Sequence, residues 1–443
     1  MKFSHSLIAA AILSALTSIA TAQDISLKAT VNNANDLSQF NETLASTTSP
    51  VTVNAENKAA MYITTGGDYT VDGLKKDVTF QFTGSNTHNG GVAMRFGKDS
   101  NITFKDFTNL TFIGKEYKKE KSTWILGQKT QFGSSQSRLE NLTFTDVELS
   151  TWLKDSDISI DVFAENFSTN QAINVNTNNL TLNFNEIEEG TFDGSQNFGA
   201  GIKTAASKSV TINGGDISVG SIDGSDDAIY AVSDSNLTIN GQSLTTGTKD
   251  VSSTGGIRSD GITYISTAKG RQSVINGNIY VGKNGQLNWT KGGDVTINGN
   301  IRNDGGLTSF GQRDGESLTS LTINGTNPNE TSVYPNGFTT ANSYVGADTF
   351  KLYGTLIVTG DTDIKSSNAT FNSYDNQEGI HIQNGSTLHF LSSGNDQILT
   401  IESKNKPAIS INGNDSSIVV ESGQLNITGG VASSAGTINF GTS

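Results

Sequence analysis

Cysteine is absent from the 443-residue chain, and proline occurs only 4 times. The lack of cysteine excludes a disulfide scaffold, thiolate metal ligands and a cysteine nucleophile. Charged residues are also scarce, at 16%, and their balance is acidic, with a formal net charge of −14 at pH 7. A chain of this charge has no electrostatic attraction to nucleic acid, so we expect no nucleic-acid partner.

Long hydrophobic runs are missing as well, and the one apolar stretch near the start is short. Lys2 precedes the apolar residues 7–16, and the small residues Ala20-Thr21-Ala22 follow. This order is typical of a signal peptide over residues 1–22 and predicts cleavage between Ala22 and Gln23. The stretch is shorter than the roughly 20 residues that a spanning helix needs. We therefore expect an exported chain, either associated with the cell surface and outer membrane or extracellular.

The rest of the chain is rich in glycine, at 48 residues, and repeats one short pattern. The pattern is an alternating strand that stops at Asn-Gly. Its clearest copies read Val/Leu-Thr-Ile-Asn-Gly and occupy residues 210–214, 237–241, 295–299 and 321–325. Alternation places Val and Ile on one face of a strand and Thr on the other. Asn and Gly tolerate the positive φ of a sharp turn.

The spacing of these copies decides between two folds. Asn-Gly between strands also favours an antiparallel hairpin, which would give a meander or sandwich. However, Gly214 and Gly241 are 27 residues apart, and Gly299 and Gly325 are 26 apart. These intervals match one coil of about three short strands, stacked on similar coils that together bury a core. The sequence therefore predicts an all-β fold, a right-handed parallel β-helix.

The β-helix is expected to cover residues 61–443, after an amino-terminal cap over residues 23–60. Two intervals break the rhythm and predict loop excursions. Residues 115–138 begin with a dense charged cluster, and residues 326–342 contain Pro328 and Pro335. A charge run is usually a solvated loop, although it can also present a binding site.

Candidate catalytic residues are few and weak. Asp226 and Asp227 lie close in sequence, and Asp260 follows about one coil later. Carboxylates on neighbouring coils could supply the acid and base of glycoside cleavage. Adjacent Asp residues on one strand point to opposite faces, however, and more often end a turn. No tandem calcium motif is present, and we expect no metal and no cofactor.

Other polar residues are expected to have structural roles. His381 and His389 each lie between two apolar residues, which places both on the polar face of a strand. Asparagines that end the repeated strands are expected to form hydrogen-bonded ladders along the stack. The candidates are Asn213, Asn240, Asn298 and Asn324.

This combination of features resembles a known family. Two pairs of segments are similar to sequence segments of bacterial autotransporter passenger domains. They are residues 228–231 followed by 235–241, and residues 201–203 followed by 209–214. The resemblance covers the mature chain and implies a β-helix that crosses the outer membrane with the help of a translocation machinery. No segment has the alternating, aromatic-girdled pattern of a translocator barrel. We therefore expect a passenger without its translocator.

A rod of repeats with no convincing catalytic set favours a function in binding. Our first hypothesis is an adhesin or self-associating stalk, with host or bacterial surface glycans or proteins as partners, because a rod of repeats can add up many weak contacts. A second hypothesis is a secreted, pectin-lyase-like polysaccharide-cleaving enzyme centred on the three aspartates. A third is a spacer that holds another domain away from the membrane.

Overall fold

The structure is a computed structural model. It describes residues 23–27, 31–55, 60–82, 93–114, 125–147, 149, 153, 156–169, 173–174, 179–184, 189–193, 201–204, 206–220, 227–247, 256–325, 337–394 and 397–440. The predicted signal peptide, residues 1–22, lies outside the described residues. Of the predicted cleavage site, Ala22 is therefore not described, whereas Gln23 begins the first strand.

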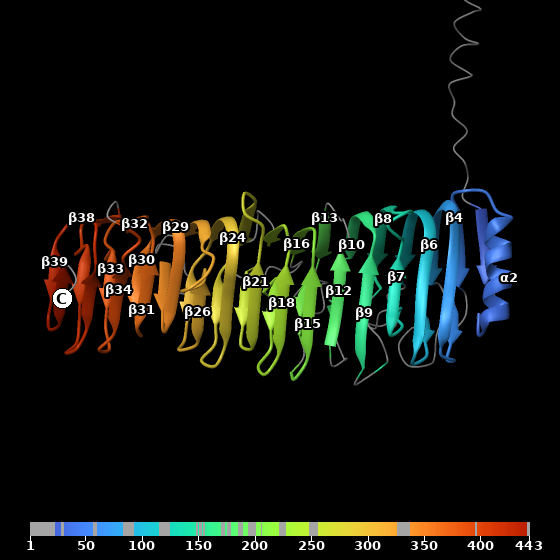
Figure 1. Cartoon of the computed structure of the whole chain (residues 1–443), viewed down its shortest axis with the longest axis horizontal. Helices are drawn as coiled ribbons and strands as arrows, with labels where there is room; N and C mark the ends of the chain where they lie inside the picture. Colours follow the sequence, from blue (N-terminus) through green and yellow to red (C-terminus); the bar gives the residue numbers. More distant parts are fainter. Residues whose placement is uncertain are drawn as a thin grey trace, which may run out of the picture.

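The chain winds into a rod of stacked coils, with the strands of successive coils side by side (Figure 1). All pairings among the named strands are parallel, including those between copies of the repeated unit. Val210 pairs with Leu237 and Ile212 with Ile239, so one repeat of the unit is one coil. The predicted parallel β-helix is therefore confirmed, and the antiparallel alternative is wrong.

The coils present three sides, each a ladder of parallel strands. Ladder 1 consists of β1 (Gln23–Leu27), β2 (Val51–Ala55), β4 (Gly67–Phe82), β6 (Ser100–Ile113), β8 (Leu139–Thr145), β10 (Ala164–Thr169), β13 (Glu189–Asp193), β16 (Asp216–Gly220), β19 (Ser243–Thr246), β22 (Gln272–Asn276), β24 (Gln286–Asn298), β27 (Leu318–Asn324), β29 (Ser343–Tyr353), β32 (Asn368–Asn372), β35 (Ile398–Glu402) and β38 (Gln424–Thr428).

Ladder 2 shares four long strands with ladder 1. It consists of β4, β6, β7 (Lys129–Phe132), β9 (Asp157–Val162), β12 (Asn179–Phe184), β15 (Ser209–Asn213), β18 (Asn236–Asn240), β21 (Ile262–Ser266), β24, β26 (Leu307–Phe310), β29, β31 (Thr362–Lys365), β34 (Thr387–Leu391), β37 (Ser417–Val420) and β40 (Thr437–Phe440). The shared strands β4, β6, β24 and β29 run across the corner between the two sides, which joins both ladders into one 27-stranded sheet.

Ladder 3 is a separate 11-stranded sheet of mostly three- and four-residue strands. It consists of β11 (Ile173–Asn174), β14 (Ile202–Lys203), β17 (Ile229–Ala231), β20 (Ile257–Ser259), β23 (Ile279–Val281), β25 (Ile301–Asn303), β28 (Gly337–Thr340), β30 (Thr355–Val358), β33 (Ile380–Ile382), β36 (Ile409–Ile411) and β39 (Val431–Ser433). A pair formed by β3 (Met61–Ile63) and β5 (Met94–Phe96) takes the same place in earlier coils.

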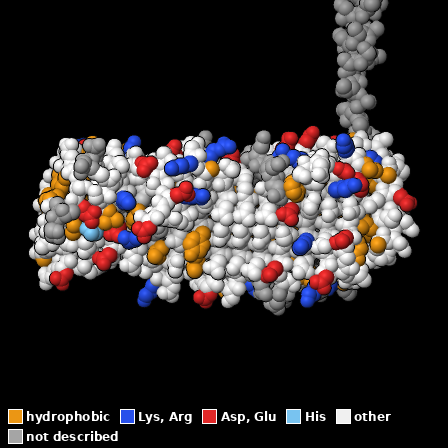
Figure 2. Space-filling model, viewed as in Figure 1, with side chains coloured by type: hydrophobic (Ala, Val, Ile, Leu, Met, Phe, Trp, Pro, Cys, Tyr) orange, Lys and Arg blue, Asp and Glu red, His pale blue; other side chains and the backbone are white. Residues whose placement is uncertain are grey.

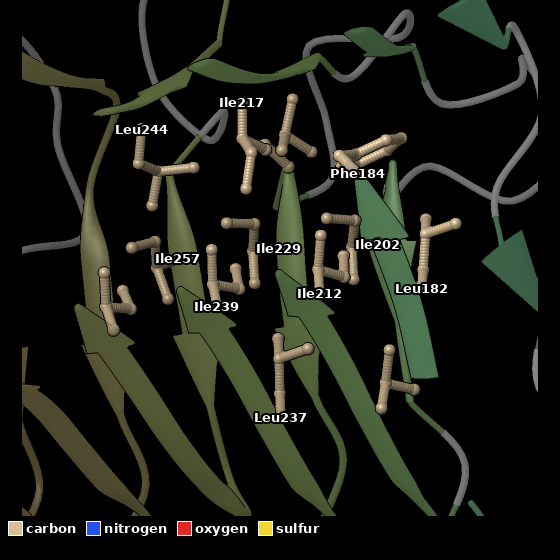
Figure 3. Packing of buried hydrophobic residues seen from close by; sticks show 14 of the residues in the cluster. Leu182, Phe184, Ile202, Ile212, Ile217, Ile229, Leu237, Ile239, Leu244 and Ile257 are labelled. Carbon is tan, nitrogen blue, oxygen red and sulfur yellow. The ribbon is translucent and has the colours of Figure 1, made fainter. Parts of the chain in front are cut away.

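Alternation along each strand builds the core. In β15 and β18 the aliphatic residues are at most 1% exposed, while Thr211 and Thr238 between them face outward. Figure 3 shows these aliphatic side chains from neighbouring coils packed in rows inside the rod. Burial of apolar area at about 25 cal/mol per Å² is the main force that holds one coil on the next.

Phenylalanine replaces the aliphatic residues in the amino-terminal half. The Phe112 ring is stacked between Phe80 and Phe144, with centroid distances of 5.3 and 5.0 Å and interplanar angles of 11° and 4°. Phe104 stacks in the same way on Phe132, at 5.1 Å. These rings are at most 1% exposed, so an aromatic column continues through this part of the core.

The amino-terminal end of the rod carries α2 (Ala34–Ala45), the one helix among the described residues (Figure 1). Asn33 caps it, since its side chain accepts from the backbone N–H groups of Asn35 and Asp36. Phe40 packs against Phe80, with centroids 6.1 Å apart. The interval expected to be a cap, residues 23–60, thus contains α2 together with β1 and β2 of ladder 1.

The two intervals expected to be loop excursions are only partly described. Residues 115–124 and 326–336 lie outside the described residues. The later part of each interval is a ladder strand, β7 in the first and β28 in the second. The chain takes 37 residues to return from Asn300 to Gly337, against 22 between Asn276 and Asn298. Coils of very different length therefore keep the same strand pairing.

Candidate binding surface

The outward face carries runs of amide hydrogen bonds between coils. In ladder 2, Asn183 donates from Nδ2 to Asp161 at 2.9 Å, Asn213 to Asn183 at 3.0 Å and Asn240 to Asn213 at 2.9 Å. In ladder 1, Asn324 donates to Asn298 and Asn298 to Asn276, each at 2.8 Å. The predicted asparagine ladders at Asn213, Asn240, Asn298 and Asn324 are confirmed, as two runs on two sides of the rod.

These runs have a direction. An Asp carboxylate at neutral pH only accepts hydrogen bonds. Asn183 must therefore turn its Nδ2 toward Asp161, so its Oδ1 faces the next coil and receives Nδ2 of Asn213. The same order recurs where Asn109 donates to Asp77 and Asn141 donates to Asn109. Each such run thus starts at an acceptor and leaves its last Oδ1 facing the following coil.

The candidate catalytic aspartates lie beside ladder 3. Asp226 is outside the described residues, and Asp227 precedes β17. Asp260 follows β20, where its Oδ2 accepts from Arg258 Nε at 2.8 Å and from the Tyr230 hydroxyl at 3.0 Å. Burial first, and then this hydrogen bond to Asp260, raise the pKa of Tyr230 above its ordinary value. Asp260 is therefore held in a local network.

This network is part of a column of alternating cations and aromatic rings on the outside of ladder 3. Lys203, Tyr230, Arg258, Tyr280 and Arg302 occupy one outward position in successive coils. Arg258 lies 4.9 Å from the Tyr230 ring centroid and 5.4 Å from that of Tyr280. Arg302 pairs with Asp304, which also accepts from the Tyr280 hydroxyl at 3.1 Å.

The column leaves little for a ligand. The cations cover ring faces that a sugar would need for stacking, and the two arginines are paired with Asp260 and Asp304. Oδ2 of Asp260 already receives two hydrogen bonds. The column therefore stabilises the stacking of coils, and the described geometry gives Asp260 a structural role rather than an open reaction site.

His381 and His389 lie on outward strand positions, as predicted. The neighbours of His381 and His389 within their strands are fully buried. Nδ1 of His381 is 2.5 Å from Glu378, and His389 lies between Asp363 and Glu421 at 3.7 and 3.6 Å. Among the residues that the structure describes, no group of three His, Asp or Glu side chains is placed to hold a metal ion.

A hollow of about 300 Å³ opens at the corner between ladders 2 and 1. Its walls include Asn240 at the end of β18, Ser266 at the end of β21, and Lys291 and Gly292 in β24. Lys291 is paired with Glu316, which also lines the hollow, at 3.4 Å. The walls thus offer an amide, a hydroxyl, the ion pair of Lys291 with Glu316, and Lys269 as a second cation.

Tyr264 stands next to this hollow. Its strand pairs with β18 so that Thr238 lies opposite Tyr264 and Asn240 opposite Ser266. The Tyr264 side chain points outward and is 41% exposed, which makes it one of the few large exposed side chains of the described rod. The local sequence does not reveal its outward position, because alternation in residues 262–265 places one aliphatic residue on each face.

The face beside the hollow carries few charges. The rows that lead to it from β12 to β18 consist of Asn, Ser and Thr, and Figure 2 shows the middle of this face almost free of charged side chains. In a chain with a net charge of −14, an uncharged polar area of this extent is a distinct feature.

Comparisons with protein-family models, with curated proteins and with solved structures find no match for this chain. Within the described residues, no helix has the length and apolar character needed to cross a membrane.

Proposed function

We propose that the chain is an exported, autotransporter-like passenger that works by binding, as an adhesin or self-associating stalk at or near the cell surface. The observation that carries the proposal is the rod itself, in which outward rows of Asn, Thr and Ser repeat from coil to coil. Repeated weak contacts add to a strong attachment when many of them engage at once.

Export follows from the predicted signal peptide, and passage across the outer membrane from the resemblance to autotransporter passengers. The acidic charge of −14 supports surface partners such as glycans and proteins over nucleic acid. A polysaccharide-cleaving enzyme has less support, since Asp260 is engaged by Arg258 and Tyr230.

The proposal is tested with the purified mature chain, residues 23–443, coupled to beads. We expect the beads to clump together or to attach to bacterial or animal cells, while beads that carry the heat-unfolded chain do neither. Folded chain that neither clumps nor attaches to any of these surfaces would refute the binding role. Mass spectrometry of exported protein should find Gln23 at the amino terminus, and an intact residue 1–22 segment would contradict the export step.

A further inference from the structure

The hollow at the corner exists because β24 departs from its neighbours. After β18 and β21 the chain leaves the sheet to turn the corner, whereas β24 continues through it as one strand. The pairing of β21 with β24 shifts between Ile265 and Ser266, so Ser266 faces Lys291 instead of Thr290. Bulges of this kind bend a strand and often lie next to functional sites.

Glycine lets the buried side chains pack closely beneath the hollow. A Cβ atom on Gly292 would lie 2.5 Å from Oγ1 of the buried Thr267 and 3.3 Å from Nε1 of Trp289, so a side chain at this position would press into the core under the hollow. Below the wall, the buried Trp289 donates from its indole N–H to the same Thr267 oxygen at 3.3 Å. A buried ring and its hydrogen bond thus support the wall from below, and support of this kind favours a preformed site.

The polar groups at the opening are complementary to hydroxyl groups. Asn240 ends its amide run, so its Oδ1 faces the following coil, where Ser266 lies. Ser266 can donate and accept, Lys291 donates and Glu316 accepts. Sugar hydroxyls need this mixture of donors and acceptors within a small space.

An exposed aromatic ring next to such groups adds the apolar contact that sugar recognition also needs. Tyr264 presents apolar surface to solvent, and the C–H face of a pyranose ring can cover it. Tyr264 and Asn240 are diagonal neighbours across β21 and β18, a spacing that a long side chain can bridge. One ligand can therefore contact Tyr264 and the hollow together.

We propose that the hollow and Tyr264 together bind a sugar unit of an uncharged glycan. This inference rests on the proposed binding function and assigns it a site and a ligand class. The one carboxylate of the hollow, Glu316, is paired with Lys291, and the second lysine of its lining, Lys269, is exposed to solvent. The net charge of −14 repels anionic glycans, while the uncharged rows from β12 to β18 let a neutral chain approach.

The test measures binding of the mature chain to soluble oligosaccharides by titration calorimetry. Uncharged cello-, chito- and malto-oligosaccharides are compared with oligogalacturonate and heparin fragments. We expect at least one uncharged series to bind and the charged series to bind less tightly. If only the charged fragments bind, or no fragment does, the proposal is wrong.

Two variants locate the site. Tyr264→Ala should weaken binding about tenfold or more, because it removes the ring contact, and Ser266→Leu should abolish binding by filling the hollow. Tyr353→Ala is the matched control, because Tyr353 is 38% exposed and lies on β29, away from the walls of this hollow. Unchanged sugar binding in both site variants would refute the assignment.

The outcome is separable from that of the proposed function. Beads that attach to cells while the soluble chain binds no uncharged sugar would overturn this site and leave the binding role standing. Beads that attach to nothing would refute the binding role itself.

Discussion

The direction of the asparagine runs makes the effect of one substitution depend on its place in a run. Asn213 is internal, because it donates to Asn183 and accepts from Asn240. Asn213→Asp keeps the acceptor and removes the donor, so a carboxylate oxygen would face Oδ1 of Asn183 about one hydrogen-bond length away. Asn276 starts its run and accepts from Asn298, while Gly247 occupies the place before it. Asn276→Asp therefore keeps every hydrogen bond that the run uses.

The magnitude follows from the lost bond and the new repulsion. A net hydrogen bond contributes about 1 kcal/mol, and an acceptor left without its donor costs about 1–3 kcal/mol when buried. Because the Asn213 side chain is half-buried, water screens part of this cost. We expect Asn213→Asp to lower the free energy of local opening by about 1–2 kcal/mol. Asn276→Asp should change it by less than about 0.5 kcal/mol.

Hydrogen exchange of the mature chain, followed by mass spectrometry, measures both effects in the strands concerned. The amides of β12, β15 and β18 should exchange faster in Asn213→Asp, and those of β22 and β24 should be unchanged in Asn276→Asp. The two variants add the same charge to residues of similar exposure, so a general effect of acidity would affect both alike. Equal losses in the two variants would refute the argument from direction.

Three further predictions concern other parts of the rod. Phe112→Ala should lower the free energy of unfolding by about 3–5 kcal/mol, since it empties the aromatic column, and chemical unfolding with a Phe112→Leu comparison measures this. The pKa values of Tyr230 and Tyr280 are raised by burial and by their Asp partners, so their contribution to stability is complete below about pH 10 and is lost as pH rises through the folded pKa values. Burial also raises the pKa of Tyr344. Absorbance titration should therefore show these three phenols titrating late, and Tyr230→Phe should leave two of them; an unchanged number of late phenols in that variant would contradict the column. Asn33→Ala should cost about 1 kcal/mol at the cap of α2 and speed hydrogen exchange in that helix alone, whereas unchanged exchange there would show that the cap contributes nothing.

The fold was predictable because its repeat is local. The unit at residues 210–214 carries the alternation, the turn residues and the asparagine of one coil edge, and its spacing equals one coil. Val210 and Ile212 could be assigned to the core from alternation alone. The asparagine ladders followed from the same register, since identical residues in parallel coils come opposite one another.

Features that depend on pairing between strands were not predictable. Residues 262–265 alternate ambiguously, and only the pairing of Ile265 with Ile239 turns Thr263 inward and Tyr264 outward. The hollow lies beside the register shift between β21 and β24, which no local pattern reveals. The helix α2 was missed as well, although Asn33 and the spacing of Leu37, Phe40 and Leu44 carry the signal of a capped amphipathic helix.

Because coil length varies, the length of the rod and its width are set independently, whereas most folds couple the two. Between Asn300 and Gly337 the chain uses 37 residues for one turn, and elsewhere it uses 22, yet each turn advances the rod by one strand spacing of about 4.8 Å. The length of the rod is therefore set by the number of turns, whereas its width and the shape of its surface are set by the residues between strands. Evolution can enlarge a corner without changing how far the tip stands from its base, and it can add whole turns without redesigning any contact already made.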